Sequence, residues 1–218
     1  MQFERDMAFA RTEIICHGAR AQRIGERIFH NTCKYLKSTD FVKGNISDKE
    51  REKMIDSISL VGLINMPKDL EKIDTGCDII FQILLGDDEQ GLQTAKKIKE
   101  ESSIPNITFI IGETENELDI PYIVVGEKED ICETFLDLFS IYTFPQEYGA
   151  DFEELRPFFD YNGKLSTEKG KSFNLCVVRK ASKEVRDTRE LFELEKSEGT
   201  AVIASRIVKE GKIQYYSI

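Results

Sequence analysis

The chain has 218 residues, of which 40% are hydrophobic and 32% are charged, and its formal net charge is −10 at pH 7. No apolar run approaches the roughly 18 to 20 residues that a membrane helix needs, so we expect no membrane association. The acidic balance disfavours a nucleic-acid partner, because such proteins carry a basic face. Arg20, Arg23 and Arg27 nevertheless offer a local basic patch. The first residues lack the basic start and apolar run of a secretory signal, which favours a cytoplasmic location.

The cysteines indicate packing and not chemistry. There are five, and no two of them form a CxxC pair: Cys16, Cys33, Cys77, Cys132 and Cys176. Neither a zinc knuckle nor a thioredoxin-type redox pair is therefore indicated. Most of them lie within apolar patterns, where a free cysteine behaves as a small hydrophobe in a reducing compartment.

Along the first two thirds of the chain, short apolar runs alternate with helical patterns. Residues 12–16 predict a strand, and residues 19–37 predict a helix with apolar positions at three- and four-residue spacings, namely Ala21, Ile24, Ile28, Thr32 and Leu36. Residues 77–85 predict a second strand, followed by a helix over 92–101. Further strands are expected at 107–111 and 122–126, and a helix at 128–142 has Ile131, Phe135, Leu138 and Phe139 on one stripe.

The segment between the first helix and the second strand is less regular. Residues 38–51 are polar, and Ser47-Asp48-Lys49-Glu50 resembles the start of a capped helix. Residues 55–64 fit either the end of that helix or a strand.

Continuous apolar strands separated by helices are typical of a parallel sheet that is buried on both faces. We therefore predict an α/β fold: a doubly wound, mostly parallel, Rossmann-like domain over residues 1–145. Residues 146–218 predict a connecting helix and a smaller α+β subdomain, which ends in a β-hairpin with a turn at Glu210-Gly211.

The loop after the 77–85 strand is the most informative local feature. It runs from Gly86 to Gly91, between a strand and a helix, where α/β proteins hold phosphates on helix N–H groups. Asp87, Asp88 and Glu89 in this loop would repel a phosphate. Asp87 and Asp88 are candidate ligands for Mg²⁺ or Ca²⁺, and the alternative is a solvated loop.

Other signatures give little. Gly170-Lys171-Ser172 resembles the end of a P-loop, but position 165 holds Leu165 where the pattern requires glycine, so we reject it. His17 ends the first strand, where α/β proteins place functional groups, and it could equally cap or fill the core. His30 falls in mid-helix and favours a structural role.

The order of these parts resembles the tubulin/FtsZ superfamily. Two strand, loop and helix units are followed by a central helix and a smaller α+β domain, with the second loop in the place of the family's glycine-rich signature. Tyr148-Gly149-Ala150-Asp151-Phe152-Glu153-Glu154-Leu155 is similar to the family's NxDxxD loop, with Asp151 and Glu154 at the two acids. The sequence departs from the family at both glycine loops, and Gly149 stands where asparagine is expected.

The resemblance implies a nucleotide site formed by Gly18, Ala19, Arg20, Gly86 and Gly91, with Asp151 and Glu154 as candidate catalytic acids. GTP is disfavoured as the cofactor because the phosphate loop has lost its glycines. The function expected is that of a degenerate, non-catalytic binding or scaffold protein, with a protein partner or a second copy of the chain.

The alternative is a small-molecule or metal-dependent enzyme on a Rossmann- or flavodoxin-like sheet, with its site at the carboxyl ends of the strands. Its candidate residues are His17, Asp87, Asp88 and Glu113. Fold alone does not choose between these functions.

Overall fold

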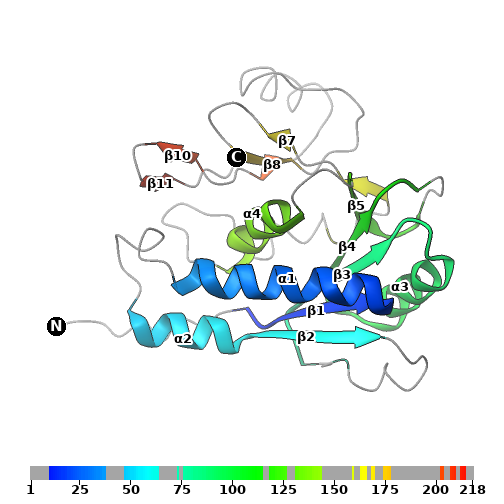
Figure 1. Cartoon of the computed structure of the whole chain (residues 1–218), viewed down its shortest axis with the longest axis horizontal. Helices are drawn as coiled ribbons and strands as arrows, with labels where there is room; N and C mark the ends of the chain where they lie inside the picture. The colour runs from blue at the N-terminus through cyan, green and yellow to red at the C-terminus, as the bar shows by residue number, and fades with distance from the viewer. Residues whose placement is uncertain are drawn as a thin grey trace.

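A computed structural model of the chain (Figure 1) describes a parallel α/β sheet with helices on both faces. The residues it describes are 10–37, 47–63, 73, 76–114, 118–126, 131–143, 159, 163–165, 168–169, 174–177, 202–203, 207–209 and 212–214.

The central sheet has six strands in the order β2-β1-β3-β4-β5-β6, and every neighbouring pair is parallel. The strands are β1 (Thr12–His17), β2 (Ile58–Leu63), β3 (Ile79–Leu85), β4 (Asn106–Ile111), β5 (Pro121–Val125) and β6 (Gly163–Leu165). This confirms the predicted α/β fold with a parallel sheet. The order of the first five strands is that of flavodoxin-like doubly wound sheets.

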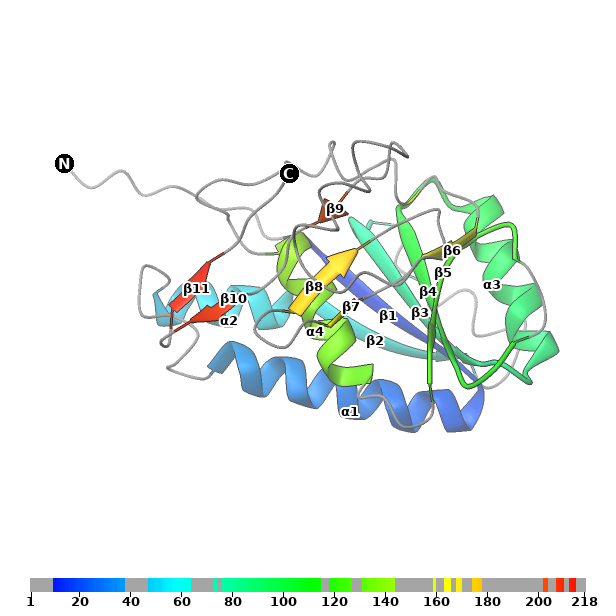
Figure 2. The same cartoon turned by 90° about the horizontal axis from the view of Figure 1, so that it is seen from above.

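Within the described residues four helices lie beside the sheet: α1 (Gly18–Lys37), α2 (Asp48–Asp56), α3 (Glu89–Glu101) and α4 (Ile131–Thr143). Figure 2 shows α1 and α4 on one face and α3 on the other. Alternate residues of each strand point to opposite faces of the sheet, so every strand contributes side chains to both cores. In β1, Ile14 and Cys16 belong to the α1/α4 side and Ile15 to the α3 side.

The larger core lies between the sheet and helices α1 and α4. Its centre is aromatic: the rings of Phe81 and Phe135 meet edge to face with centroids 5.0 Å apart, and Phe135 stacks on Phe139 at 5.8 Å. An aromatic pair of this kind adds about 0.5–1.5 kcal/mol beyond the burial of its area. Phe135, Leu138 and Phe139 are fully buried, which confirms the predicted apolar stripe on α4.

The segment that the sequence left ambiguous contains both elements. α2 ends at Asp56, and β2 begins at Ile58 after one turn residue. The predicted cap is confirmed: the Glu50 backbone N–H donates to the Ser47 hydroxyl, and the Ser47 backbone N–H donates to Glu50 Oε2 at 2.6 Å. The pKa of Glu50 is lowered because the Ser47 side chain and backbone donate to its carboxylate.

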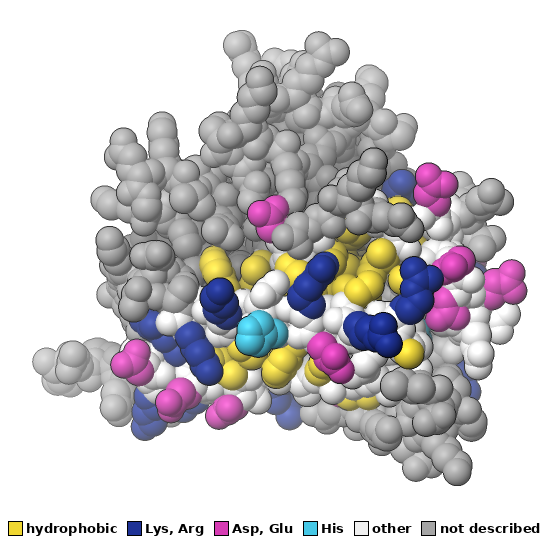
Figure 3. Space-filling model, in the orientation of Figure 1, with side chains coloured by type: hydrophobic (Ala, Val, Ile, Leu, Met, Phe, Trp, Pro, Cys, Tyr) yellow, Lys and Arg dark blue, Asp and Glu magenta, His cyan; other side chains and the backbone are white. Residues whose placement is uncertain are grey.

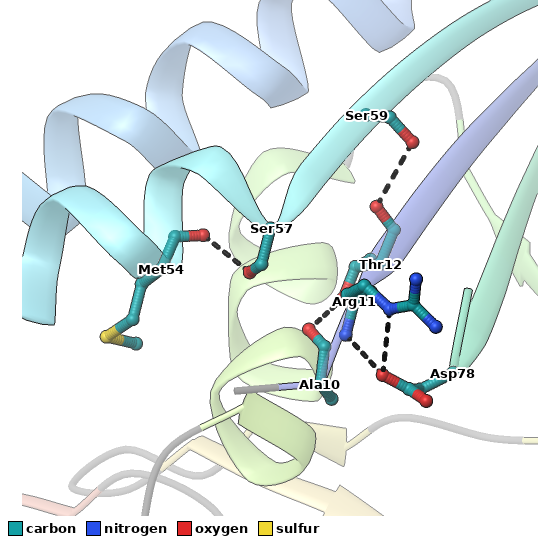
Figure 4. A network of polar contacts seen from close by, with 7 residues as sticks. All are labelled: Ala10, Arg11, Thr12, Met54, Ser57, Ser59 and Asp78. Atoms are coloured by element: carbon teal, nitrogen blue, oxygen red, sulfur yellow. Dashed lines mark hydrogen bonds and ion pairs between the residues drawn. The ribbon is translucent and has the colours of Figure 1, made fainter. Parts of the chain in front are cut away.

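Polar contacts hold the amino ends of the strands together (Figure 4). The Arg11 backbone N–H donates to Asp78 Oδ2 at 2.7 Å, and the Arg11 Nε atom lies 3.8 Å from the same oxygen. The Ser57 hydroxyl donates to the Met54 carbonyl at 2.7 Å at the junction of α2 and β2. These contacts stabilise the end of the sheet where the strands begin. A ligand site is expected at the opposite end, where the strands finish.

Beyond α4 the structure describes short strands. β6 joins the central sheet, although its residues belong to the segment assigned above to the second part of the chain. Further on are β7 (Glu168–Lys169), β8 (Asn174–Val177), β9 (Val202–Ile203), β10 (Ile207–Lys209) and β11 (Lys212–Gln214), of which β10 and β11 pair antiparallel. The α+β subdomain as a unit lies largely outside the described residues and stays a prediction. None of the described helices is long and apolar enough to cross a membrane.

Candidate functional site

The candidate site lies where β1 and β3 end. In the sheet, β2 lies next to β1 on the side away from β3, and β4 lies next to β3 on the side away from β1. Between two such strands the loops diverge to opposite faces and leave a crevice at the carboxyl edge. The first turns of α1 and α3 both begin at this point, directly after β1 and shortly after β3.

Asp88 occupies the position over the start of α3. Its backbone caps the helix, and its Oδ1 atom accepts a hydrogen bond from the Gly91 N–H at 2.9 Å. Its Oδ2 atom lies 3.7 Å from the point where a Cβ on Gly18 would stand, so the carboxylate also faces the start of α1. A helix N-terminus stabilises an anion, and here the anion belongs to the chain itself.

The capping by Asp88 also corrects the predicted loop. We expected a loop from Gly86 to Gly91 with the helix starting at position 92, whereas α3 begins at Glu89. The physical reason is the Asx-type cap, which organises the first turn three residues earlier. Glu89 is therefore the acidic first residue of a helix, where the dipole favours it.

Packing alone explains why residues 86 and 91 of the loop after β3 are glycines, without a ligand. A Cβ on Gly86 would overlap the backbone carbonyl of Glu113, because the loop after β4 packs directly on this residue. A Cβ on Gly91 would lie 2.6 Å from Asp88 Oδ2, so the absence of a side chain leaves room for the cap. Gly18 has φ +79°, a conformation that favours glycine as β1 turns into α1.

His17 lies at this edge but is enclosed. Its side chain is buried, and its Nε2 atom lies 2.9 Å from Gln82 Oε1. The Gln82 Nε2 atom donates to the Ala95 carbonyl at 3.2 Å, which turns the amide oxygen toward the imidazole. The His17 Nε2 atom is therefore the proton donor of a neutral ring. Burial lowers the pKa of His17 against the smaller opposing effects of the Gln82 hydrogen bond and the Asp88 charge.

The remaining sequence candidates are placed as follows. Ala19 and Arg20 are exposed in the first turn of α1, and Asp87 is exposed beside Asp88. Glu113 is exposed, and its backbone rather than its carboxylate meets the site loop. Asp151 and Glu154 lie outside the described residues. The structure thus brings together Gly18, Gly91, His17 and Asp88 at one edge.

The described residues include no group of three or more His, Cys, Asp or Glu side chains that could hold a metal ion. The Asp88 Oδ1 atom accepts a hydrogen bond from the Gly91 N–H, and the acidic residues on either side of it, Asp87 and Glu89, are exposed. A metal ion held by Asp87 and Asp88 therefore stays a prediction.

Sequence reasoning missed a row of buried polar residues on the α3 face. Gln82 is aligned with Thr108 across β3 and β4, and Asn106 precedes Thr108 on the same face. All three are fully buried, and the side-chain polar atoms of Asn106 and Thr108 have no hydrogen-bond partner among the residues that the structure describes. A signal existed for Gln82, because it is the single polar residue within the apolar run of β3.

No protein-family model, curated protein or solved structure matches this chain. The parallel α/β sheet therefore stands on the structure itself, and kinship with tubulin and FtsZ stays a prediction.

Proposed function

We propose that the chain is a non-catalytic binding or scaffold protein, built on a doubly wound sheet whose phosphate position is closed by its own Asp88 carboxylate. The observation that carries the proposal is the bond from the Gly91 N–H to Asp88 Oδ1 at 2.9 Å, with Oδ2 turned toward Gly18. A nucleotide phosphate would have to displace this cap and then lie beside a carboxylate. Each such like-charge contact costs on the order of 1 kcal/mol even in water.

Within this proposal the chain is a degenerate relative of the tubulin/FtsZ superfamily. The support is the order of strand, loop and helix units, together with Gly86 and Gly91, the two glycines that remain at the second loop. In such a relative the glycines would persist for packing, as Gly86 and Gly91 do here, after nucleotide binding is lost.

The alternative, a small-molecule enzyme with His17 as its base, is favoured by one observation. The burial of His17 keeps the imidazole neutral, as a general base requires, at the carboxyl edge of the sheet. Against it, His17 is 3% exposed, and its Nε2 proton is directed at Gln82. A substrate would reach this ring only after the surrounding groups move.

The proposal is tested by titrating the purified protein with GTP and Mg²⁺, and by measuring phosphate release. We expect neither bound nucleotide nor turnover from the parent protein. Turnover that disappears in Asp151→Ala would overturn the proposal and restore the family mechanism. Turnover that persists in Asp151→Ala and disappears in His17→Gln would favour the enzyme alternative.

A further inference from the structure

The outer face of α1 carries a continuous row of basic side chains. Six residues follow one another at three- and four-residue spacings, and all six are exposed: Arg20, Arg23, Arg27, His30, Lys34 and Lys37. The opposite face of the helix is buried against the sheet through Ala21, Gly25, Ile28, Thr32 and Leu36. We call the six exposed residues the basic face of α1. Residues at these spacings are neighbours on a helix surface, so they form one line.

The basic face contrasts with the rest of the chain. α1 holds five Lys and Arg residues against one acid, Glu26, which gives the helix a net charge of +4 in a protein whose net charge is −10. The Glu26 side chain accepts a hydrogen bond from Gln22 at 3.2 Å. In Figure 3 the basic side chains form a band across the face that α1 presents, with one histidine among them.

No intramolecular partner neutralises this band in the part of the chain that the structure describes. The ion pairs recorded there join Arg11 to Asp78, Arg51 to Asp48 and Lys97 to Glu101, and none includes a residue of the basic face. Like charges three or four residues apart destabilise a helix by about 0.2–0.5 kcal/mol per pair. The helix dipole accounts for Lys34 and Lys37 in the last turn of α1, but helix stability gives no reason for the three arginines before them.

The length and ends of the band favour a particular kind of anion. From position 20 to position 37 an α-helix rises about 26 Å, which is the length of a second helix of ordinary size. At its amino-terminal end the band meets the acidic start of α3, since Asp88 faces Gly18 and its neighbours Asp87 and Glu89 are exposed. A long polyphosphate that continued past this end would meet carboxylates, whereas an acidic helix of the same length as the band would end before them.

We propose that the basic face of α1 docks an acidic helix of a partner protein, with carboxylates spaced three and four residues apart. The inference rests on the proposed function, because it names the partner that a binding protein of this fold would take. Complementary charge would speed association and fix the register of the two helices, and the interaction would weaken as salt screens it.

The probe is a labelled helical peptide of about 20 residues, with glutamates at three- and four-residue spacings along one face. A peptide of the same composition, with its glutamates distributed around the helix, serves as its control. Fluorescence anisotropy at about 50 mM and about 300 mM NaCl gives the two affinities. We expect the patterned peptide to bind more tightly than its control and to lose affinity at high salt.

Variants separate the basic face from net charge. Arg23→Glu with Arg27→Glu should weaken binding of the patterned peptide by at least about tenfold. Lys49→Glu with Lys164→Glu changes the net charge equally at exposed positions elsewhere and should stay within about twofold. Circular dichroism confirms that both variants are folded.

Three results would overturn the inference: equal weakening in both double variants, no preference for the patterned peptide, or tighter binding of a single-stranded oligonucleotide or of phosphatidylserine vesicles. The GTP titration on the same samples keeps the two proposals apart. Bound GTP would contradict the proposed function and leave the peptide result standing. Failure of the peptide without bound GTP would contradict the docking surface alone.

Discussion

The carboxylate of Asp88 and the backbone N–H of Gly91 form a 2.9 Å hydrogen bond across the first turn of α3. The bond occupies a backbone N–H that could otherwise donate to a bound phosphate. It also joins the loop after β3 to the first turn of α3. The bond also explains why an aspartate is favourable in this loop, which is bounded by two glycines.

The first prediction tests this cap. Asp88→Ala should lower the free energy of unfolding by about 1 kcal/mol, since an N-cap acceptor is lost, and Asp88→Asn should cost much less because asparagine caps equally well. Asp87→Ala is the matched control: its side chain is exposed, and its effect should stay within about 0.5 kcal/mol. Urea denaturation measures all three. Equal losses from Asp87→Ala and Asp88→Ala would contradict a specific contribution of the Asp88–Gly91 hydrogen bond to stability.

The second prediction concerns metal ions at Asp87 and Asp88. A bound ion at a hundredfold excess over its dissociation constant would stabilise the protein by about 2.7 kcal/mol. We expect no change in melting temperature with Mg²⁺ or Ca²⁺, in the parent or in Asp87→Asn with Asp88→Asn. A rise in the parent that the double variant loses would show a metal site at the end of β3 and would favour the enzyme alternative.

The third prediction compares two glycines that have different neighbours. A side chain at Gly86 would overlap the Glu113 backbone carbonyl, whereas one at Gly62 would overlap only the end of the Gln22 side chain. The Glu113 backbone cannot move aside for an added Cβ atom as easily as the flexible Gln22 side chain can. Gly86→Ala should therefore cost about 1–3 kcal/mol, and Gly62→Ala should cost less. Thermal unfolding of both variants measures the difference, and a larger loss at Gly62 would contradict the packing argument.

The fold could be predicted because its signals are local and repeated. Apolar runs such as β3 and the three- and four-residue spacing of α1 depend only on neighbouring residues, and the parallel sheet follows from their alternation. The strand order could not be predicted, because no local pattern says which strands pair. The short β6, which joins the sheet from beyond position 145, has only three residues and no apolar run.

The sequence predicted where the strands beside the candidate site end, but not the contacts made there. The sequence located the carboxyl ends of β1 and β3 correctly, because His17, Gly18 and Gly86 follow apolar runs. It did not predict that Asp88 turns back onto Gly91, since capping geometry depends on backbone angles that a loop sequence leaves open. Nor did it single out the pair His17–Gln82, which forms only when β1 and β3 are neighbours in the sheet.

The fourth prediction concerns thiol reactivity. Burial raises the pKa of Cys16 to about 12, with a smaller contribution from the charge of Glu26, and Cys77 and Cys132 are also buried. Cys33 is half-buried on α1. Because only an accessible thiolate attacks, iodoacetamide should modify Cys33 before the other three in the native protein. Peptide mass mapping after timed quenching identifies the order, and early modification of Cys16 would contradict its burial where β1 packs against α1.

The last prediction follows from the enclosed imidazole. Burial lowers the pKa of His17 in the native protein. Below about pH 6.5, the ordinary histidine pKa, the unfolded chain therefore binds a proton at this residue that the native protein does not bind. Stability should therefore be fullest above about pH 6.5 and fall with acidification, by up to about 1.4 kcal/mol per pH unit from this group. Urea unfolding between about pH 5 and pH 7 should show a shallower slope in His17→Gln than in the parent. His30→Gln removes the exposed histidine of the basic face and isolates the contribution of His17. A parent slope that His17→Gln leaves unchanged would show that the fold does not hold the His17 ring neutral.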